Sequence, residues 1–386
     1  MRLADRMSRL GTETAFEVLA RARQLEATGR TIIHLEIGEP DFDTPAHIIE
    51  AACAALHSGY THYGPSAGDP ELRATIAEHM LTTRGLTVTP DEVVVVPGAK
   101  PIIYWGITAV VNAGDEVIYP NPGFPIYESM INFVGGKPVP IALREVNEFR
   151  LDAQELKSLV TPKTRMIIIN SPQNPTGGVL ELEDLQAIAE VALANDIVVM
   201  TDEPYETILY EGTHHSIASL PGMKERTILI DGFSKAFAMT GWRLGYGVMP
   251  ADLAAMVARL QTNCTSCTSA ATQRAGIAAL KGSMEPTRVM VAEFKRRRDV
   301  VVAGLNSLPG VSCLSPHGAF YVFPNITGTR VDCRTLAKRC MEEAGVAVLA
   351  GTAFGEYGDG YLRLSYANSV ENIQKAIEQM REMLTK

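Results

Sequence analysis

The residue in this sequence most suited to chemistry is a lysine set among small and apolar residues. Lys235 lies in the segment DGFSKAFAMTGWRLGYGV, residues 231–248, soon after the apolar run TILI at 227–230. An all-apolar run of this length is typical of a buried parallel strand. Burial lowers the pKa of a lysine, and the neutral amine is a nucleophile that forms Schiff bases with carbonyl groups. The alternative is a lysine that snorkels from a turn into solvent.

A second basic residue with a possible ligand follows eight positions later. Arg243 lies between Trp242 and Leu244, and a guanidinium group suits bidentate binding of a phosphate. A lysine for an aldehyde and an arginine for a phosphate together indicate pyridoxal 5'-phosphate (PLP). An arginine on a solvated surface needs no ligand, so the rest of the chain has to decide between these interpretations.

Short apolar runs alternate with helical patterns from about residue 90 onward. The runs are residues 93–96, 116–119, 166–169, 197–200, 227–230 and 245–248. Strands of this length that alternate with helices predict a mainly parallel, doubly wound α/β sheet with helices on both faces. In such sheets ligands bind outside the carboxyl ends of the strands.

Polar residues come soon after four of these runs. Gly98-Ala99-Lys100 follows VVVV, Asn174 follows MIII, Asp202 follows IVVM and Lys235 follows TILI. Because the carboxyl ends of parallel strands meet at one edge of a sheet, these residues are expected to lie close together. This convergence favours one ligand site over four separate surface features.

Each of these groups has a use at a PLP site and an ordinary structural alternative. The 98–100 segment offers backbone N–H groups and a helix N-terminus to a phosphate, although many α/β turns look alike. Asp202 can pair with the ring nitrogen of PLP, or it can cap the next element. Tyr205, three residues on, can reach the same cofactor through its hydroxyl. The amide of Asn174 suits the phenolic oxygen, but NPTG is also a turn signal.

Four further residues have two interpretations each. Phe124 can stack on a planar ring or belong to the core. Arg363, in the apolar strand YLRLSY, can bind a substrate carboxylate or form an internal salt bridge. Gly38, in LEIGEPDFDTP, allows close approach of a ligand to the backbone or marks a plain turn. Tyr63 is a loop residue that either faces solvent or reaches a neighbouring subunit.

Composition and charge exclude several classes of protein. The chain has 386 residues, of which 46% are hydrophobic and 20% charged, with a net charge of −9. An acidic balance argues against nucleic acid or an anionic membrane as the main partner. The first residues lack the apolar segment of a signal peptide and no apolar stretch is long enough to span a membrane, so a cytoplasmic location is expected.

Six cysteines are scattered through the chain and do not suggest a disulfide framework. Cys264 and Cys267 form a lone CxxC. Without a second pair of ligands nearby, they are expected to be small packed residues and not a metal or redox site.

The pattern predicts three parts. Residues 1–44 hold a helix at 12–27 and a loop that packs with the small domain, and residues 45–282 form the large cofactor-binding domain. From residue 283 an α+β pattern predicts a small C-terminal domain. Its expected elements are a long helix at 285–307, strands at 319–323 and 361–366, and helices at 332–344 and 370–384.

Three motifs follow one another in the chain: SPQNPTGG, TDEPY and SKAFAMTGWRLGYG. By these motifs the chain resembles the class I/II aminotransferases, which are PLP enzymes of fold type I, and the likeness extends from LEIGEPDFDTP to RLSYANS. The subgroup it resembles most is the bacterial and archaeal aspartate aminotransferase-like enzymes. The resemblance implies a mainly parallel seven-stranded sheet, a smaller α+β domain and a homodimer with shared active sites.

The resemblance also implies roles at the reacting end of the cofactor. Lys235 would form the Schiff base with PLP and then carry the proton between the substrate Cα and the C4′ atom of the cofactor. Asp202 would bind the pyridinium nitrogen. Asn174 and Tyr205 would hydrogen-bond the ring oxygen, and Phe124 matches the aromatic residue that stacks on the ring.

Other roles implied by the resemblance concern the phosphate and the substrate. The residues expected at the phosphate are Gly98, Ala99, Lys100, Ser234 and Arg243, with Tyr63 reaching the phosphate of the neighbouring subunit. The residues expected at the substrate α-carboxylate are Arg363, Gly38 and Asn174. The expected reaction moves an amino group from an L-amino acid to a 2-oxo acid, with 2-oxoglutarate as acceptor, by a ping-pong mechanism.

Two departures and two alternatives remain open. Gly232 stands where many relatives have the first serine of S-x-S-K, and no arginine clearly matches the one that reads the side-chain carboxylate in aspartate enzymes. A PLP-dependent β C–S lyase, or an elimination like that of aminocyclopropane-carboxylate synthase, would use the same Lys235 and Asp202. A regulator with an aminotransferase-like domain would need a DNA-binding module, and only about 30 residues precede the Gly38 loop.

Overall fold

A seven-stranded sheet forms the centre of the molecule in the computed structural model, which describes all 386 residues. Its strands are β2 (Val93–Val96), β3 (Glu116–Asn121), β4 (Lys137–Ala142), β5 (Thr164–Asn170), β6 (Val198–Asp202), β7 (Thr227–Gly232) and β8 (Gly245–Val248). The order across the sheet is β2-β8-β7-β6-β5-β3-β4, and β8 alone runs in the direction opposite to the other six strands. The predicted mainly parallel sheet is confirmed.

Helices cover both faces of this sheet because its strands are apolar on both sides. Val94 and Val96 pack with α4 (Lys100–Val110), α5 (Ile126–Val134) and α8 (Ala251–Cys264). Val93 and Val95 point to the opposite face, as the two-residue period of a strand requires. The helices that pack on that second face are α2 (Ala46–His57), α3 (Pro70–Arg84), α6 (Ala153–Leu159), α7 (Leu182–Ala194) and α9 (Ala270–Lys281).

Strand β4 was not among the expected strands, because its sequence, KPVPIA, contains two prolines. It pairs only with β3, and Pro138 and Pro140 lie opposite Val117 and Tyr119. Proline cannot donate a ladder hydrogen bond, so it is tolerated at a sheet edge. Because the two prolines are two residues apart in the strand, their backbone nitrogens, which carry no hydrogen, both face the same, open side of the edge strand.

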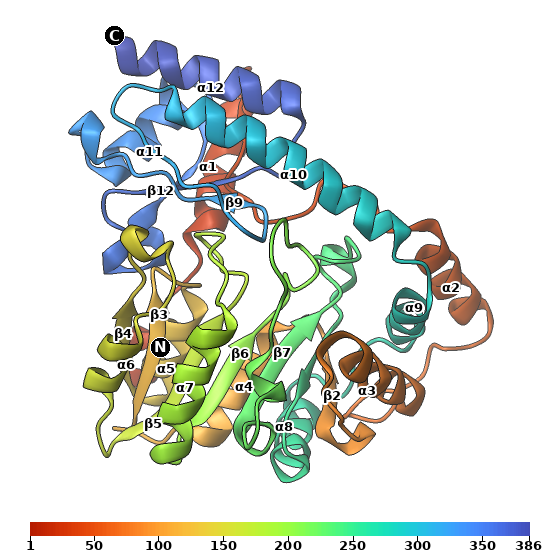
Figure 1. The fold of residues 1–386 in the computed structure, drawn as a ribbon. Helices are drawn as coiled ribbons and strands as arrows, with labels where there is room; N and C mark the ends of the chain where they lie inside the picture. Colours follow the sequence, from red (N-terminus) through yellow and green to blue (C-terminus); the bar gives the residue numbers. More distant parts are fainter.

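The remaining elements form a second, smaller assembly above the sheet in Figure 1. Its strands are β1 (Ile33–His34), β9 (Tyr321–Val322), β10 (Val346–Ala347), β11 (Leu349–Ala350) and β12 (Leu362–Ser365). Its helices are α1 (Thr14–Glu26), α10 (Glu285–Asn306), α11 (Cys333–Glu342) and α12 (Val370–Thr385). A core of 32 buried residues holds this assembly together, and three of them, Tyr205, Ile208 and Tyr210, come from the segment that follows β6.

The N-terminal segment joins the C-terminal part, since β1 pairs in parallel with β10. The expected strand at 319–323 is shorter than predicted, because Ala319 has a left-handed backbone (φ 56°) and only Tyr321 and Val322 form β9. The other expected helices and strands of this part agree with the structure within about three residues. The boundaries between the domains at residues 44 and 282 stay a prediction.

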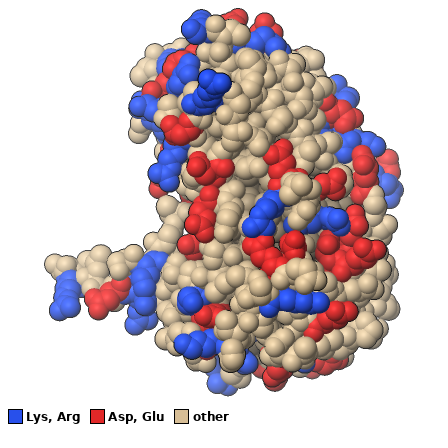
Figure 2. Space-filling model, turned by 60° about the vertical axis from the view of Figure 1, so that its left-hand side comes forward, with Lys and Arg blue, Asp and Glu red and all other residues tan.

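The surface mixes charges of both signs. Lysine and arginine side chains are interspersed with aspartate and glutamate over the face drawn in Figure 2, without a large basic patch on that face. None of the helices combines the length and the apolar composition that crossing a bilayer requires.

Candidate active site

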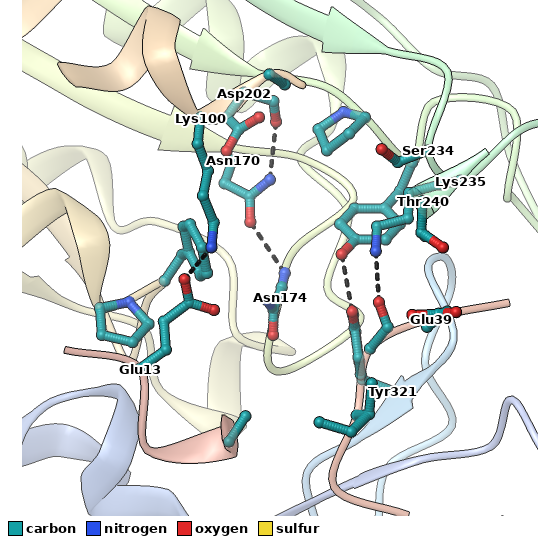
Figure 3. Close-up of a pocket in the computed structure, with 18 of the residues that line it drawn as sticks. Glu13, Glu39, Lys100, Asn170, Asn174, Asp202, Ser234, Lys235, Thr240 and Tyr321 are labelled. Carbon is teal, nitrogen blue, oxygen red and sulfur yellow. Dashed lines mark hydrogen bonds and ion pairs between the residues drawn. The ribbon is translucent and has the colours of Figure 1, made fainter. Parts of the chain in front are cut away.

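A cavity of 460 Å³ lies where the carboxyl ends of the central strands meet β9, β12 and the N-terminal loop (Figure 3). All of the residues predicted from the sequence to form the site line it, except Gly98 and Tyr63. The lining residues among them are Gly38, Ala99, Lys100, Phe124, Asn174, Asp202, Tyr205, Ser234, Lys235, Arg243 and Arg363. The structure therefore brings together residues that are more than 300 positions apart in the chain.

Lys235 extends into this cavity from the loop after β7. Its Nζ donates a hydrogen bond to the backbone oxygen of Gly38 and lies 5.6 Å from the centre of the Phe320 ring. Burial lowers the pKa of Lys235 to about 8, and the positive charges of Arg363, Lys100 and Arg243 act in the same direction. About a tenth of the amine is therefore neutral at pH 7, far more than for a lysine with the ordinary pKa of about 10.4, and this neutral form can act as a nucleophile or a general base.

Asp202, the last residue of β6, has a buried carboxylate. Tyr127 Oη donates a hydrogen bond of 2.5 Å to its Oδ2 atom. Burial raises the pKa of Asp202 to about 7, the negative charges of Asp231 and Glu203 add to the increase, and the Tyr127 hydrogen bond opposes it. Because the pKa of Asp202 lies near neutral pH, a cationic partner such as a pyridinium would strongly favour the ionised form of this carboxylate.

Arg363 is a buried cation without a carboxylate partner. It donates to Asn174 Oδ1 at 3.4 Å and to the backbone oxygen of Glu36, while its Nε atom has no partner. The internal salt bridge that the sequence left open is not formed. Burial lowers the pKa of Arg363, and an unpaired buried guanidinium N–H is a donor available to a carboxylate.

Two tyrosines connect Arg363 with the lysine side of the cavity. The hydroxyl groups of Tyr205 and Tyr321 form a hydrogen bond of 2.8 Å, and the Arg363 guanidinium lies 4.7 Å from the centre of the Tyr321 ring. A Cβ atom at Gly38 would overlap the Tyr321 hydroxyl. Only glycine lets the N-terminal loop come this close, so Gly38 is more than a plain turn.

An anion site is built at the start of α4. Gly98 has a φ of 81°, and a Cβ atom there would overlap Arg243 Nη2. The close approach keeps the guanidinium beside Ala99, the N-cap residue of α4, where backbone N–H groups are free. Ser234 and Arg243 both line the cavity at this end. A helix N-terminus with an arginine and a hydroxyl suits a phosphate.

Gly232, the departure noted in the motif, has a packing reason. A Cβ atom there would lie 3.1 Å from Gly245 Cα and 3.2 Å from the Leu244 backbone oxygen. Strands β7 and β8 therefore meet more closely than a serine allows without a small backbone shift.

Three predicted residues have surroundings that the sequence did not reveal. The Lys100 ammonium pairs with Glu13 and lies 5.5 Å from the centre of the Phe124 ring. Phe124 in turn meets Tyr127 edge to face at 5.7 Å. Tyr63 is 90% exposed and lies outside the cavity of its own chain. A contact of Tyr63 with a neighbouring subunit stays a prediction.

Sequence reasoning missed four residues that shape the site. Tyr127 binds Asp202, Tyr321 binds Tyr205, Glu13 pairs with Lys100, and Asn170 Nδ2 donates to the backbone oxygen of Asp202 at 2.8 Å. Asn170 could have been found, because it ends β5 directly before SPQNPTGG. The other three act across long sequence separations and carry no local signal.

The donor set fits PLP. An amine with a lowered pKa, a buried carboxylate with a raised pKa and an anion site surround one cavity, as an aldehyde, a pyridine nitrogen and a phosphate require. The lone CxxC lies outside this cavity, with Cys264 exposed and Cys267 half-buried. No group of three or more His, Cys, Asp or Glu side chains is arranged to hold a metal ion.

Comparison with known proteins defines the class and then the family. The family "Aminotransferase class I and II" matches residues 30–380. An aspartate aminotransferase from Pyrococcus abyssi is 44% identical over 92% of each chain. An aromatic-amino-acid aminotransferase from Thermococcus litoralis is 40% identical over 100% of this chain and 98% of its own length.

A solved structure agrees with these relatives. Aspartate aminotransferase from Thermus thermophilus, solved with maleate, is 38% identical, and the match covers 99% of this chain and 100% of that one with a TM-score of 0.94. The fold and the site thus define a PLP-dependent enzyme of fold type I. The chain belongs to the class I and II aminotransferases, and it is an aminotransferase.

Proposed function

We propose that this aminotransferase moves the amino group of an L-amino acid to 2-oxoglutarate by a ping-pong mechanism, in which one 2-oxo acid leaves before the other binds. The observation that carries the proposal is the Lys235 amine, whose pKa is lowered to about 8, in one cavity with Asp202 and Arg363. When bound, PLP supplies an aldehyde for amines and a ring that accepts the electron pair left at the substrate Cα.

Lys235 is the proposed base of the reaction. With PLP and a substrate bound, the Lys235 amine would remove the proton from the substrate Cα and return it at the C4′ position. The backbone oxygen of Gly38, which accepts a hydrogen bond from Nζ, keeps the amine near this path. Positioned general bases of this kind contribute about 10²–10⁴-fold to a rate.

Asp202 is proposed to hold the proton on the ring nitrogen. It must be ionised to do so, and the Tyr127 hydroxyl that donates to Oδ2 stabilises the ionised form. Tyr205 and Asn174 are proposed to donate to the phenolic oxygen, and Phe124 to stack on the ring. All three line the same cavity as Asp202.

Arg363 is proposed to bind the substrate α-carboxylate, with Asn174 and Gly38 assisting. Its unpaired Nε and its burial support this role, because a charge-assisted hydrogen bond away from water is strong. The proposed phosphate site consists of Gly98, Ala99, Lys100, Ser234 and Arg243. Lys100 contributes there through the N-terminal turn of α4, because its ammonium points to Glu13.

We propose a homodimer in which Tyr63 reaches the phosphate site of the partner. Its 90% exposure in the loop before α3 leaves it available for such a contact. The cavity is proposed to lie between a large domain, residues 45–282, and a small domain, residues 283–386 with residues 1–44.

The donor is proposed to be an acidic or an aromatic amino acid, as the names of the relatives suggest. Four cations line the cavity, and Lys235, Arg243 and Arg363 already have proposed partners. Lys100 is therefore the cation left for a side-chain carboxylate, while its pairing with Glu13 favours neutral side chains. A panel of amino acids with 2-oxoglutarate distinguishes these donors.

Lys235→Ala tests the proposed function. We expect loss of transamination and loss of the absorbance of the lysine-bound cofactor, whereas Lys157→Ala, a substitution on the exposed side of α6, leaves both unchanged. Normal turnover by Lys235→Ala would contradict the proposal. Release of ammonia and pyruvate without an added 2-oxo acid would favour the lyase alternative.

A further inference from the structure

A buried arginine lies behind the active site and takes no part in the cavity. Arg84, the last residue of α3, has a side chain with no exposed surface. Its Nε donates to Glu203 Oε2 at 2.8 Å, and its Nη2 donates to Asp231 Oδ2 at 2.7 Å. One guanidinium therefore binds two buried carboxylates from two different strand ends.

These two carboxylates are neighbours of the residues that do the proposed chemistry. Glu203 directly follows Asp202 at the end of β6, and Asp231 lies in β7, four residues before Lys235. Strands β6 and β7 are adjacent and pair up to Asp202 and Ile230. Arg84 thus ties together the two strand ends that carry the carboxylate and the amine of the site.

The two acids of this cluster are well supplied with donors. Glu203 accepts hydrogen bonds from Ser216 at 2.7 Å and Thr201 at 2.9 Å, and His214 Nε2 lies 3.0 Å from Oε2. Burial opposes ionisation of Glu203, but the charges of His214 and Arg84 and their hydrogen bonds outweigh it and lower its pKa to about 2.

Asp231 is held in the same way. It accepts from Tyr246 Oη at 3.0 Å and from the backbone N–H of Gly232 at 2.6 Å, in addition to Arg84. Burial, together with the negative charge of Glu203, raises the pKa of Asp231 above its ordinary value, and Arg84 and these two donors oppose that increase. Three donors aimed at one carboxylate favour its ionised form.

The charge balance of the cluster matters for Asp202. The negative charges of Asp231 and Glu203 both favour the protonated form of Asp202, which cannot hold a proton on a pyridine ring. Arg84 forms ion pairs with both of these carboxylates. Because the site is buried, water cannot screen the two negative charges in its place.

We propose that Arg84 is a positioning residue for the reaction: its guanidinium compensates Glu203 and Asp231 and ties β6 to β7, so that Asp202 keeps its negative charge in register with Lys235. This inference rests on the proposed role of Asp202. The charged and titratable groups that face Arg84 or Asp202 are His79, Tyr127, Glu203, Tyr205, Glu206, His214, Asp231, Lys235 and Tyr246.

The test measures the titration of Asp202 in the apoprotein by carboxyl ¹³C NMR, with Asp202→Asn to assign its signal. Arg84→Met removes a positive charge, so we expect the Asp202 midpoint to rise by about one pH unit. Asp231→Asn removes a negative charge and is expected to lower that midpoint. Arg84→Lys keeps the charge and should titrate close to the wild type.

A purely structural clamp gives a different result, because it predicts no opposite-sign shifts. Absence of the shifts, or shifts of the same sign in Arg84→Met and Asp231→Asn, would overturn the inference. If Arg84→Met does not fold, the downward shift in Asp231→Asn and the unchanged midpoint in Arg84→Lys decide the question.

A second readout connects the cluster with the reaction. The acidic limb of the kcat–pH profile is expected to move up in Arg84→Met and to return toward the wild type in Arg84→Met with Asp231→Asn. Full transamination by Asp202→Asn would overturn the proposed role of Asp202 and this inference together. An inactive Asp202→Asn with no shift in the Arg84 and Asp231 variants overturns the Arg84 inference alone.

Discussion

The two sides of the cavity are built on different principles. On the sheet side, Asp202 and Lys235 rest on a buried network in which Arg84, Glu203 and Asp231 satisfy one another. On the opposite side, Arg363 is held by a backbone oxygen, an amide and aromatic faces, and its Nε has no partner. The ion pairs that support the sheet side are formed without a ligand, whereas the other side keeps an unpaired donor that we propose binds the substrate.

This difference distinguishes groups that are positioned before the ligand arrives from groups that contribute binding energy. Groups fixed before the ligand arrives need no reorganisation during the reaction. A guanidinium with an unpaired donor forms that hydrogen bond only when a carboxylate binds. The free energy of the bond should therefore contribute to substrate binding. Substitutions on the sheet side should therefore lower kcat, and substitutions on the other side should raise KM.

The largest expected effect is that of Asp202→Asn. The amide cannot hold a proton on the ring nitrogen, so kcat should fall by about 10²–10⁴-fold with little change in KM. Steady-state kinetics with a good donor and 2-oxoglutarate measure both constants. A rise in KM at unchanged kcat would place Asp202 with the binding groups and remove the contrast between the two sides.

The same variant also tests how the folding stability of the apoprotein depends on pH. Burial raises the folded-state pKa of Asp202 to about 7, above the unfolded value of about 3.9. The folded state therefore binds the extra proton, and the stability that this contributes is lost as pH rises from about 4 to 7. The free energy of unfolding of Asp202→Asn, relative to that of the wild type, should therefore increase by up to about 4 kcal/mol across this pH range.

Thermal unfolding of both apoproteins at pH 4.5, 6 and 8 checks this expectation. The difference in Tm should grow with pH and level off above pH 7. A difference in Tm that does not change with pH would mean that Asp202 is ionised in the fold throughout this range.

Loss of the Arg84 network should be the largest effect on stability. Arg84→Met leaves two buried carboxylates without their cation, which costs about 3–5 kcal/mol. Arg226→Met is the matched control, because its partner Asp196 is 91% exposed and such pairs contribute about 1 kcal/mol or less. Urea denaturation of the two variants measures the difference, and equal losses would contradict the special place of Arg84.

Arg363→Lys sharpens the other half of the comparison. Lysine keeps a positive charge but loses the fork that binds a carboxylate in two places. KM for every amino acid and 2-oxo acid should rise by about 10–100-fold, a loss of about 1.5–3 kcal/mol, while kcat changes less. A fall in kcat alone would show that Arg363 acts on the reaction and not on binding.

The smallest expected effect is that of Gly232→Ser. The added atoms meet Gly245 and Leu244 at 3.1 and 3.2 Å, so the strands must shift slightly at a cost of about 1–2 kcal/mol. Cofactor affinity, measured by fluorescence titration of the apoprotein, should change by only a few-fold. A large gain in affinity would mean that the missing hydroxyl limits phosphate binding.

Much of this arrangement could be predicted from the sequence, because parallel strands bring their carboxyl ends to one edge. Asp202, Asn174 and Lys235 follow apolar runs and lie together for that reason. Strand β4 escaped prediction because prolines are acceptable only at an edge, and which strand forms the edge is a property of the whole sheet.

Other features depend on contacts between distant parts of the chain. The hydrogen bond from Tyr127 to Asp202 spans 75 positions, and the Arg84 bridge spans 119 and 147 positions. Neither has a local periodicity or a motif, since a buried charge is stabilised by partners that only the folded chain brings near. The pairing of Glu13 with Lys100 escaped for the same reason.

One measurement tests the central claim most directly. The purified protein is incubated with PLP, reduced with borohydride, digested and analysed by mass spectrometry, so that the lysine bonded to the cofactor carries a permanent label. The label is expected on Lys235, and an amino acid substrate added before reduction should prevent it. Labelling of another lysine in place of Lys235, or no labelling at all, would contradict the account.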